Sequence, residues 1–449
     1  MEHRNDSGME KGTSSHRRNT VVRLPNISYA EFRSNHLVLN QPVVIGPDLI
    51  QNWACLRYWR GTFSEEEQPN AARANTNKIT LSTGYSSPNF DYMLEDYGEF
   101  VVPVDEDGCR SQKSLREVID IWRSNDAKGR RLYVKDWHLA LQLEKSDVRM
   151  EPFYTTPRIF ADDWMNNYYL EKTDDDFRFV YMGPEGTFTR LHRDVYTSYS
   201  WSTNVVGRKR WWLFPPEVTQ YITKPNGETI GDDNLLRDTG DAETVYATVE
   251  GWPNWPIARE KMIVVEQEEG ESIFVPSGWY HQVLNLTFCI SINHNWSNSH
   301  NFESMYHSMV EATRRVEDSI QDVKELLQKR SSQGGWEEEW HTIAQDLLKQ
   351  DSGWDWSTLL AMVETNLKYP RELPPLIIRR DAQELEMTEQ VSCVKRNDPK
   401  MIPDRKFMVD KIIPCITHFA QSEWGRSSRY GQLISRLESL LGNKDNRLT

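Results

Sequence analysis

The sequence predicts a mainly β protein with α-helices, in which a β-rich centre lies between an amino-terminal α/β region and a carboxy-terminal helical region. Residues 177–299 consist of short runs rich in Val, Ile and aromatic residues, separated by Gly and Pro turns. Residues 21–176 mix such runs with helical patterns, and residues 300–449 carry apolar residues at helical spacing. Short strands at this density favour a sandwich or barrel. Residues 1–20 are polar without periodicity, and we expect them to be disordered.

Three patterns in the amino-terminal region are specific enough to name elements. Residues 21–46 predict a strand, a helix capped by Asn26 or Ser28, and a second strand. Residues 114–124 place apolar side chains at helical spacing after a capping serine, which predicts another helix. Residues 131–143 indicate a strand that turns into a helix.

Charge and composition exclude several classes of function. The formal net charge of −14 argues against general affinity for DNA or anionic membranes, which depends on Lys and Arg surfaces. The five cysteines include no CxxC pair and are typical of reduced thiols. The chain shows neither a secretory signal nor an apolar run of about 20 residues. We therefore expect a cytoplasmic or nuclear protein that binds neither DNA nor membranes. A polar insertion at 217–261 is interpreted as a lid or a surface excursion.

Two histidines and one aspartate in the β-rich centre are candidates for a metal site. His192 and Asp194 lie two positions apart, and His281 follows a turn in a second strand-like run. Taken singly, they are better explained as exposed polar residues or a hydrogen-bonded core histidine. Together they form the set that holds Fe(II) and leaves positions open for a chelating cosubstrate and O2. A closed structural zinc site would usually include cysteine, and no thiol lies nearby in the sequence.

A cationic strand follows the first two candidate ligands. Arg208, Lys209 and Arg210 come directly after Gly207, and any of them could pair with a carboxylate of 2-oxoglutarate. Alternation places Lys209 on the face of the apolar residues that follow it, where an ammonium group requires an anion. A lysine whose ammonium reaches the surface is an equally good interpretation. We expect this strand to lie beside the strand of His192 as a hairpin partner.

Three segments together resemble one known family. HRD at 192–194, GRKRWWLFPP at 207–216 and GESIFVPSGWYHQVLNL at 270–286 are similar to the JmjC oxygenases, which use Fe(II) and 2-oxoglutarate in a double-stranded β-helix of the cupin type. Within that family, the resemblance is greatest to the jumonji domain-containing protein 4 group, which is related to the jumonji domain-containing protein 6 group. The segments that show it include RLYVKDWH and DDFRFVYMGPEGT. The resemblance covers roughly residues 22–300 and implies a double-stranded β-helix core.

Carried over by position, the resemblance implies roles for named residues. The candidate ligands His192, Asp194 and His281 correspond to the iron ligands. The residues around 2-oxoglutarate correspond to Lys209, Thr189, Tyr133, Ser202, Asn204 and Asn293, with Asn285 and Asn295 as further pocket candidates.

These cosubstrate roles rest on the resemblance rather than on pattern. Lys209 then pairs with the distal carboxylate of 2-oxoglutarate, and Thr189 donates a hydrogen bond to the same carboxylate. Strand alternation by itself does not place Thr189 on the strand face of His192. Tyr133 is a core residue by pattern and a cosubstrate contact by resemblance. Ser202 departs from the family, where related enzymes have asparagine. Asn204, on the same strand face, is the candidate replacement.

The resemblance also implies a reaction and a substrate. It predicts hydroxylation of a lysine side chain in the class-1 translation termination (release) factor. We expect aromatic residues such as Tyr196 and Trp201 to flank the alkyl chain of that lysine. The alternative is N-methyl demethylation of lysine or arginine in a histone tail by the same iron chemistry. A non-catalytic scaffold is a third interpretation. Oligomeric state stays open, because the sequence does not show whether the carboxy-terminal helices dimerise.

Overall fold

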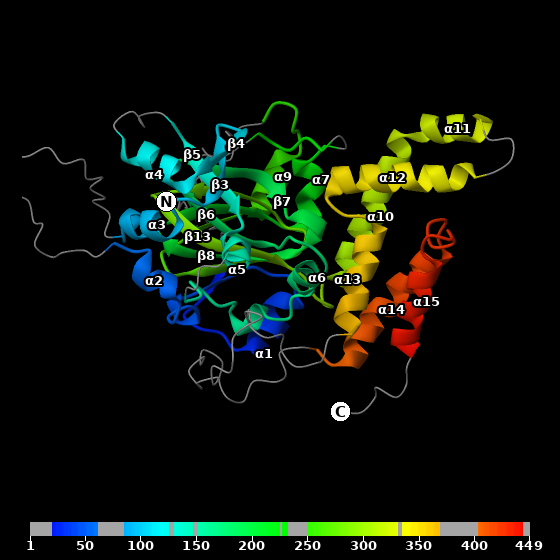
Figure 1. Ribbon diagram of the computed structural model, residues 1–449, viewed down its shortest axis with the longest axis horizontal. Helices are drawn as coiled ribbons and strands as arrows, with labels where there is room; N and C mark the ends of the chain where they lie inside the picture. Colours follow the sequence, from blue (N-terminus) through cyan, green and yellow to red (C-terminus); the bar gives the residue numbers. More distant parts are fainter. Residues whose placement is uncertain are drawn as a thin grey trace, which may run out of the picture.

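The computed structural model describes residues 20–61, 85–124, 130–146, 151–224, 227–231, 249–330, 335–368 and 403–442. Two mostly antiparallel sheets lie at the centre, and a group of helices from the carboxy-terminal part of the chain stands at one side of them (Figure 1). The sheets face each other, because Lys209 of the small sheet donates a hydrogen bond to Ser291 of the large sheet. Residues 1–19, which we expect to be disordered, lie outside the described residues.

The large sheet has nine strands in the order β1-β2-β11-β8-β13-β6-β5-β3-β4. It joins strands from the amino-terminal region to strands from the β-rich centre, and only β1 and β2 pair in parallel. Its strands are β1 Val22–Leu24, β2 Val43–Ile45, β3 Val101–Glu106, β4 Cys109–Ser114, β5 Leu132–Trp137, β6 Arg178–Gly183, β8 Tyr199–Val206, β11 Ser272–Val275 and β13 Cys289–Trp296.

The small sheet has four antiparallel strands in the order β10-β9-β12-β7. They are β7 Phe188–Arg193, β9 Lys209–Phe214, β10 Ile263–Gln267 and β12 Tyr280–Asn285. The expected hairpin between β9 and β7 is wrong, because β12 pairs with both and separates them. The chain crosses from β8 in the large sheet to β9 in the small sheet through Gly207, whose φ of +79° favours glycine.

Alternation along the strands divides the side chains between two sides of each sheet. Trp211, Leu213 and Val283 of the small sheet pack with Ile273 and Val275 of the large sheet. The opposite face of the small sheet packs against the insertion at 217–261, through a cluster made by Leu191, Trp212, Phe214, Ile222, Ile230, Trp252 and Trp255. The described parts of that insertion, including α7 Thr219–Ile222 and α9 Trp255–Lys261, therefore cover a sheet face.

The amino-terminal helices follow their predicted caps. Ser28 and Glu31 form a capping box on the first helix, and Ser114 and Glu117 form one on α4. The strand at 131–137 leads into α5, as expected. The helices here are α1 Tyr29–Phe32, the π-helical η1 Arg33–Leu37, η2 Pro47–Leu49, α2 Ala54–Tyr58, α3 Phe90–Tyr97, α4 Leu115–Arg123, α5 Leu139–Lys145, η4 Arg158–Phe160 and α6 Trp164–Lys172.

The carboxy-terminal helices form a second core with α6. Trp164 and Tyr169 of α6 belong to the same buried cluster as Trp340, Trp354 and Phe419. The expectation of helices after residue 300 is confirmed for the described residues. Their bounds are α10 Phe302–Ser319, α11 Gln321–Arg330, α12 Trp336–Ser352, α13 Trp356–Lys368, α14 Arg405–Gln421 and α15 Gly431–Gly442. None of the described helices combines the length and the hydropathy that a bilayer crossing requires.

Candidate metal centre

The three predicted ligands converge between the sheets. His281 on β12 is the register partner of His192 at the end of β7, and the two imidazole centroids are 4.2 Å apart. Asp194 follows β7 directly, and its carboxylate oxygens lie 3.8 Å from His192 Nε2 and 4.0 Å from His281 Nε2. One ligand atom from each residue lies within 4.8 Å of the other two. Cross-strand pairing therefore joins residues that are 89 positions apart in the chain.

Hydrogen bonds to the backbone set the tautomer of both histidines. His192 Nδ1 lies 2.8 Å from the carbonyl oxygen of Arg190, and His281 Nδ1 lies 3.3 Å from that of Trp279. Because a carbonyl can only accept, each Nδ1 carries the proton and each Nε2 presents a lone pair to the centre. Burial lowers the pKa of His192, and the neighbouring His281 lowers it further, so the imidazole is neutral at physiological pH.

The Asp194 carboxylate is held in its charged form. Burial alone would raise its pKa, but the two imidazoles and the side chains of Ser200 and Asn295 bring the pKa below its ordinary value. Asp194 Oδ2 is buried and, among the described residues, has no hydrogen-bond partner. A buried anionic oxygen without a donor favours a cation as its partner.

These donors fit a ferrous ion. Two neutral imidazole Nε2 atoms and one carboxylate form the two-histidine, one-carboxylate set of non-haem Fe(II) sites. About 39% of the His192 side chain is exposed, so the ligand set is open to solvent on the side of β7, which is an edge strand of the small sheet. The cluster can thus hold a metal ion and leave coordination positions for other molecules.

Lys209 is buried beside this centre, with 3% of its surface exposed. Its Nζ donates to Ser291 Oγ at 2.5 Å and lies 5.9 Å from the centroid of the Tyr181 ring. Burial lowers the pKa of Lys209 to about 8, and the described residues offer it no ion pair. Of the two interpretations open from the sequence, the inward lysine is the observed one.

The neighbouring arginines are already paired with carboxylates. Arg208 and Arg210 both form ion pairs with Glu266, and Arg208 also reaches Glu268. The three cations of the strand are therefore not equivalent. Of the three, only Lys209 points between the sheets, where it donates to Ser291 of the large sheet.

Tyr133 on β5 and Thr189 on β7 lie close together. Tyr133 is buried, and its ring centroid is 6.0 Å from that of Tyr181. Burial raises the pKa of Tyr133, while the side chains of Thr189 and Asn285 lower it, which places these residues together. The ring fits because Gly183 has no side chain: a Cβ there would lie 2.6 Å from Tyr133 Cδ2.

A β-bulge explains how Thr189 reaches the side of His192. His281 pairs with His192 and Val283 pairs with Thr189, so two steps on β12 match three steps on β7. The additional residue on β7 shifts the alternation by one position, so Thr189 and His192 share one face of the strand. Regular alternation could not predict this placement.

Three further predicted residues present polar atoms without partners. Asn293 on β13 is the register partner of Ser202 on β8. Asn204 lies two positions after Ser202 and so shares its sheet face. Within the described part of the chain, Ser202 Oγ, Asn204 Oδ1 and Asn293 Oδ1 have no hydrogen-bond partner. Asn204 is otherwise fixed by a hydrogen bond from Nδ2 to the Gln267 carbonyl oxygen at 3.1 Å. These groups are available to a polar ligand.

Tyr181 and Ser291 both contact Lys209 and were not predicted. Tyr181 lies near Lys209 and Tyr133, and its hydroxyl donates to Asp136 Oδ1 at 2.5 Å. Ser291 accepts the Lys209 hydrogen bond. The available signal was alternation: Tyr181 shares a strand face with Gly183, and Ser291 shares one with Asn293.

The predicted aromatic flanks of the substrate are wrong. Trp201 is buried in the amino-terminal core, stacked between His294 and Phe160. Tyr196 stacks on Trp354 of the carboxy-terminal helical region. Trp201 lies on the β8 face opposite Ser202, and the left-handed backbone of Tyr196, with φ 60°, turns its ring away from the ligands.

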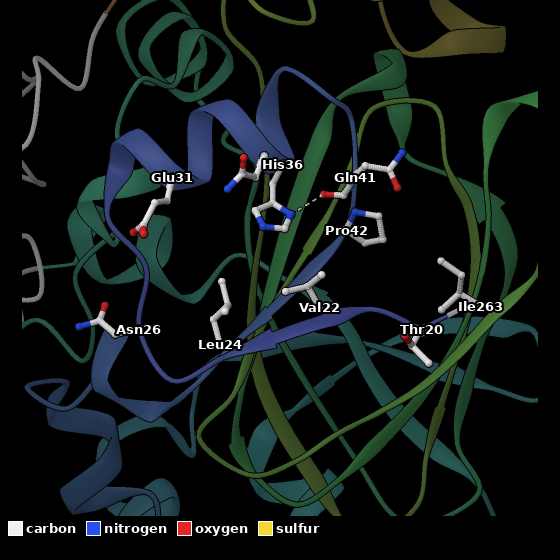
Figure 2. A pocket seen from close by; sticks show the side chains of 10 residues that line it. Thr20, Val22, Leu24, Asn26, Glu31, His36, Gln41, Pro42 and Ile263 are labelled. Carbon is white, nitrogen blue, oxygen red and sulfur yellow. Dashed lines mark hydrogen bonds between the residues drawn. The ribbon is translucent and has the colours of Figure 1, made fainter. Parts of the chain in front are cut away.

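Two other features do not belong to this centre. His138, Asp175 and Asp176 also cluster, but Asp176 is fully engaged by His138 and Arg178. A cavity of about 470 Å³ lies between β1 and the α1–η1 pair, lined by Val22, Leu24, His36, Gln41 and Pro42 among others, with His36 Nδ1 donating to the Gln41 carbonyl (Figure 2). Its lining contains none of the predicted site residues.

Comparison with known proteins agrees with this geometry. The cupin-like domain family matches residues 29–302, which contain all three candidate ligands. The chain is 32% identical over 350 residues to the 2-oxoglutarate and iron-dependent oxygenase JMJD4 of Gallus gallus, covering 75% of this chain and 71% of that protein. This chain belongs to the cupin-like 2-oxoglutarate and iron-dependent oxygenases.

Two further relatives carry names that state different activities. The JMJD4 oxygenase of Homo sapiens is 32% identical over 338 residues, with 73% of this chain and 70% of that protein covered. The arginine-specific demethylase JMJ20 of Arabidopsis thaliana is 34% identical over 319 residues, with 67% of this chain and 62% of that protein covered. Membership of the oxygenase family therefore defines the chemistry more closely than the substrate.

Proposed function

We propose that this oxygenase hydroxylates a protein side chain, and that its substrate is a lysine of the class-1 translation termination factor. The observation that carries the hydroxylase proposal is the open His192, Asp194 and His281 set together with an inward Lys209 for which the described residues provide no counter-ion. We also propose that the two facing sheets form a double-stranded β-helix, as the resemblance implies.

The proposed roles of the side chains follow from their positions. His192, Asp194 and His281 would hold Fe(II), which together with 2-oxoglutarate and O2 would oxidise a substrate C–H bond. Lys209 supplies the positive charge for the distal carboxylate of 2-oxoglutarate. Tyr133 and Thr189, which lie close together, would supply hydroxyl donors to the same cosubstrate.

The unpartnered polar atoms complete the cosubstrate pocket. Ser202, Asn204 and Asn293 line the large-sheet side with polar atoms that have no partner among the described residues. The Ser202 hydroxyl can donate to a carboxylate, whereas the Oδ1 atoms of Asn204 and Asn293 accept and would pair with a donor such as a bound water. Ser202 stands where the family has asparagine, and Asn204 occupies the same sheet face two positions on.

The lysine substrate is supported by the resemblance to the jumonji domain-containing protein 4 group and by an acidic chain that suits a cationic partner. The competing activity is N-methyl demethylation of lysine or arginine in a histone tail. The name of the Arabidopsis thaliana relative favours it. Both reactions begin with the same C–H oxidation, and a hydroxylated N-methyl group then leaves as formaldehyde.

Mass spectrometry of modified peptides distinguishes these reactions. The purified chain is incubated with Fe(II), 2-oxoglutarate and either a release-factor domain or methylated histone peptides, with D194A as the inactive control. A gain of one oxygen on a release-factor lysine supports the proposal. Loss of methyl groups with release of formaldehyde from histone peptides supports the alternative. A scaffold would form no succinate with any of these substrates.

A further inference from the structure

The turn that follows Asp194 has an unusual backbone. Tyr196 has φ 60° and ψ 14°, and Thr197 has φ 51°, so two successive non-glycine residues adopt the left-handed region. Such residues are rare singly and persist only where surrounding contacts hold them. The turn, η5 Val195–Thr197, carries the chain from the metal-ligand strand β7 to β8.

The side chain of Tyr196 is held by the carboxy-terminal helical region and by α6. Its ring stacks on Trp354 at a centroid distance of 4.1 Å and an interplanar angle of 26°. Its hydroxyl donates to the Gly353 carbonyl oxygen at 3.0 Å and accepts from the Tyr169 hydroxyl at 2.9 Å. The ring is therefore fixed in position and in rotation.

The receiving loop is shaped for this side chain. Gly353 ends α12 with φ 79°, and a Cβ at that position would lie 3.4 Å from the Tyr196 hydroxyl. Trp354 follows directly and is 1% exposed. The α12–α13 loop thus contacts the turn that follows the metal ligand Asp194. The start of α10 contacts the same turn, because Asn301 Nδ2 donates to the Thr197 carbonyl oxygen at 3.4 Å.

Asp194 depends on its backbone for orientation. The side chains of Ser200 and Asn295 bond to its carboxylate, but its Oδ2 atom has no hydrogen-bond partner among the described residues, so the turn that begins beside it also sets the direction of the carboxylate. A relaxed turn would let Tyr196 return to an ordinary conformation and would move the neighbouring Asp194 away from the two imidazoles. The helical region opposes this relaxation through its contacts with Tyr196.

We propose that Tyr196 is a positioning residue for the metal ligand Asp194, and that Trp354 of the carboxy-terminal helical region maintains the metal centre without touching it. This inference rests on the proposed metal-binding role of Asp194. It gives the helical region a part in assembling the site rather than only in packing.

The test measures metal affinity in the full chain. Mn(II) replaces Fe(II) because it does not oxidise during titration, and its binding is followed by electron paramagnetic resonance of the free ion. W354A should bind Mn(II) about tenfold more weakly or worse, the range found when outer-shell partners of a metal ligand are lost. W354F, which keeps a stacking ring, should retain most of the affinity. The matched control is W340A, a buried tryptophan of the same core that makes no described ring contact with Tyr196.

Circular dichroism confirms that each variant is folded at the titration temperature. Should W354A fail to fold, Y196F removes only the hydroxyl that binds Gly353 and Tyr169, and it should still weaken Mn(II) binding relative to W340A. Equal affinities in wild type, W354A and Y196F would overturn the inference, as would an equal loss in W340A. Absence of Mn(II) binding in the wild type would instead reject the proposed metal centre.

Discussion

Asp194 is the residue on which the metal assignment depends most strongly, since it supplies the only negative charge among the three candidate ligands. D194A should abolish Mn(II) binding and 2-oxoglutarate turnover while leaving the circular dichroism spectrum unchanged, because a charged group that lacks a hydrogen-bond partner at Oδ2 contributes little to folding. Mn(II) titration and succinate formation measure the two losses. D175A, in the His138 cluster, is the matched control and should change neither. Unchanged turnover in D194A would reject the ligand set.

Lys209 should make cosubstrate binding depend on pH. Its pKa of about 8 lies below the ordinary value of 10.5. In the enzyme without cosubstrate, half of the Lys209 side chains are therefore neutral near pH 8. A bound carboxylate favours the charged form, and binding above pH 8 therefore requires uptake of a proton. Affinity for 2-oxoglutarate should be constant below pH 8 and fall above it by up to about tenfold per pH unit.

The dissociation constant of 2-oxoglutarate is measured at a series of pH values from about 6.5 to about 9.5. K209A should bind weakly at every pH, mainly raising the requirement for cosubstrate. K209R keeps its charge throughout this range and should lose the pH dependence. A wild-type profile that is flat across pH 8 would show that Lys209 does not carry the distal carboxylate.

At the scale of elements, strand β6 provides the space in which Tyr133 lies. G183A would place a Cβ 2.6 Å from Tyr133 and 2.8 Å from Thr187 Oγ1, so either β6 or the ring must move. We expect a loss of about 1–3 kcal/mol in the free energy of unfolding, together with a raised KM for 2-oxoglutarate. Urea unfolding and succinate formation measure the two effects.

The control for this variant is G431A at the start of α15, where a Cβ meets no atom within 4 Å. It should leave both quantities nearly unchanged. A loss of stability in G183A without a change in KM would mean that Tyr133 supports the sheet but not the cosubstrate.

At the scale of the whole molecule, the two cores share residues across the predicted boundary at residue 300. Trp164, Met165 and Tyr169 of α6 and Tyr196 of the site turn are buried against helices that follow that boundary. A chain ending at residue 300 would expose this apolar surface to water. We expect it to aggregate or to bind a hydrophobic dye, as measured by sedimentation and dye fluorescence.

The control is a chain ending at residue 442, which keeps every described helix. It should remain monodisperse to the same degree as the full chain. A fully soluble chain of residues 1–300 with unchanged Mn(II) affinity would contradict both this expectation and the positioning role of Trp354.

Several features could be read from local sequence because they depend on neighbouring residues. The capping boxes at Ser28 and Ser114 require only residues three positions apart. Alternation alone assigns Lys209 to the face of Trp211 and Leu213, and the dense turns of the β-rich centre indicate a sandwich or barrel. The types of the three ligands likewise follow from the printed residues.

Only the tertiary structure decided which distant residues meet. β12 separates β7 from β9, and a bulge brings Thr189 to the side of His192. Glu266 pairs with both arginines, whereas Lys209 has no ion pair among the described residues. The left-handed turn at Tyr196 carries an aromatic ring from the site to the helical region. The periodicity of a strand specifies its faces, whereas pairing, bulges and strained turns are stabilised by contacts between segments far apart in the chain, which no local pattern contains.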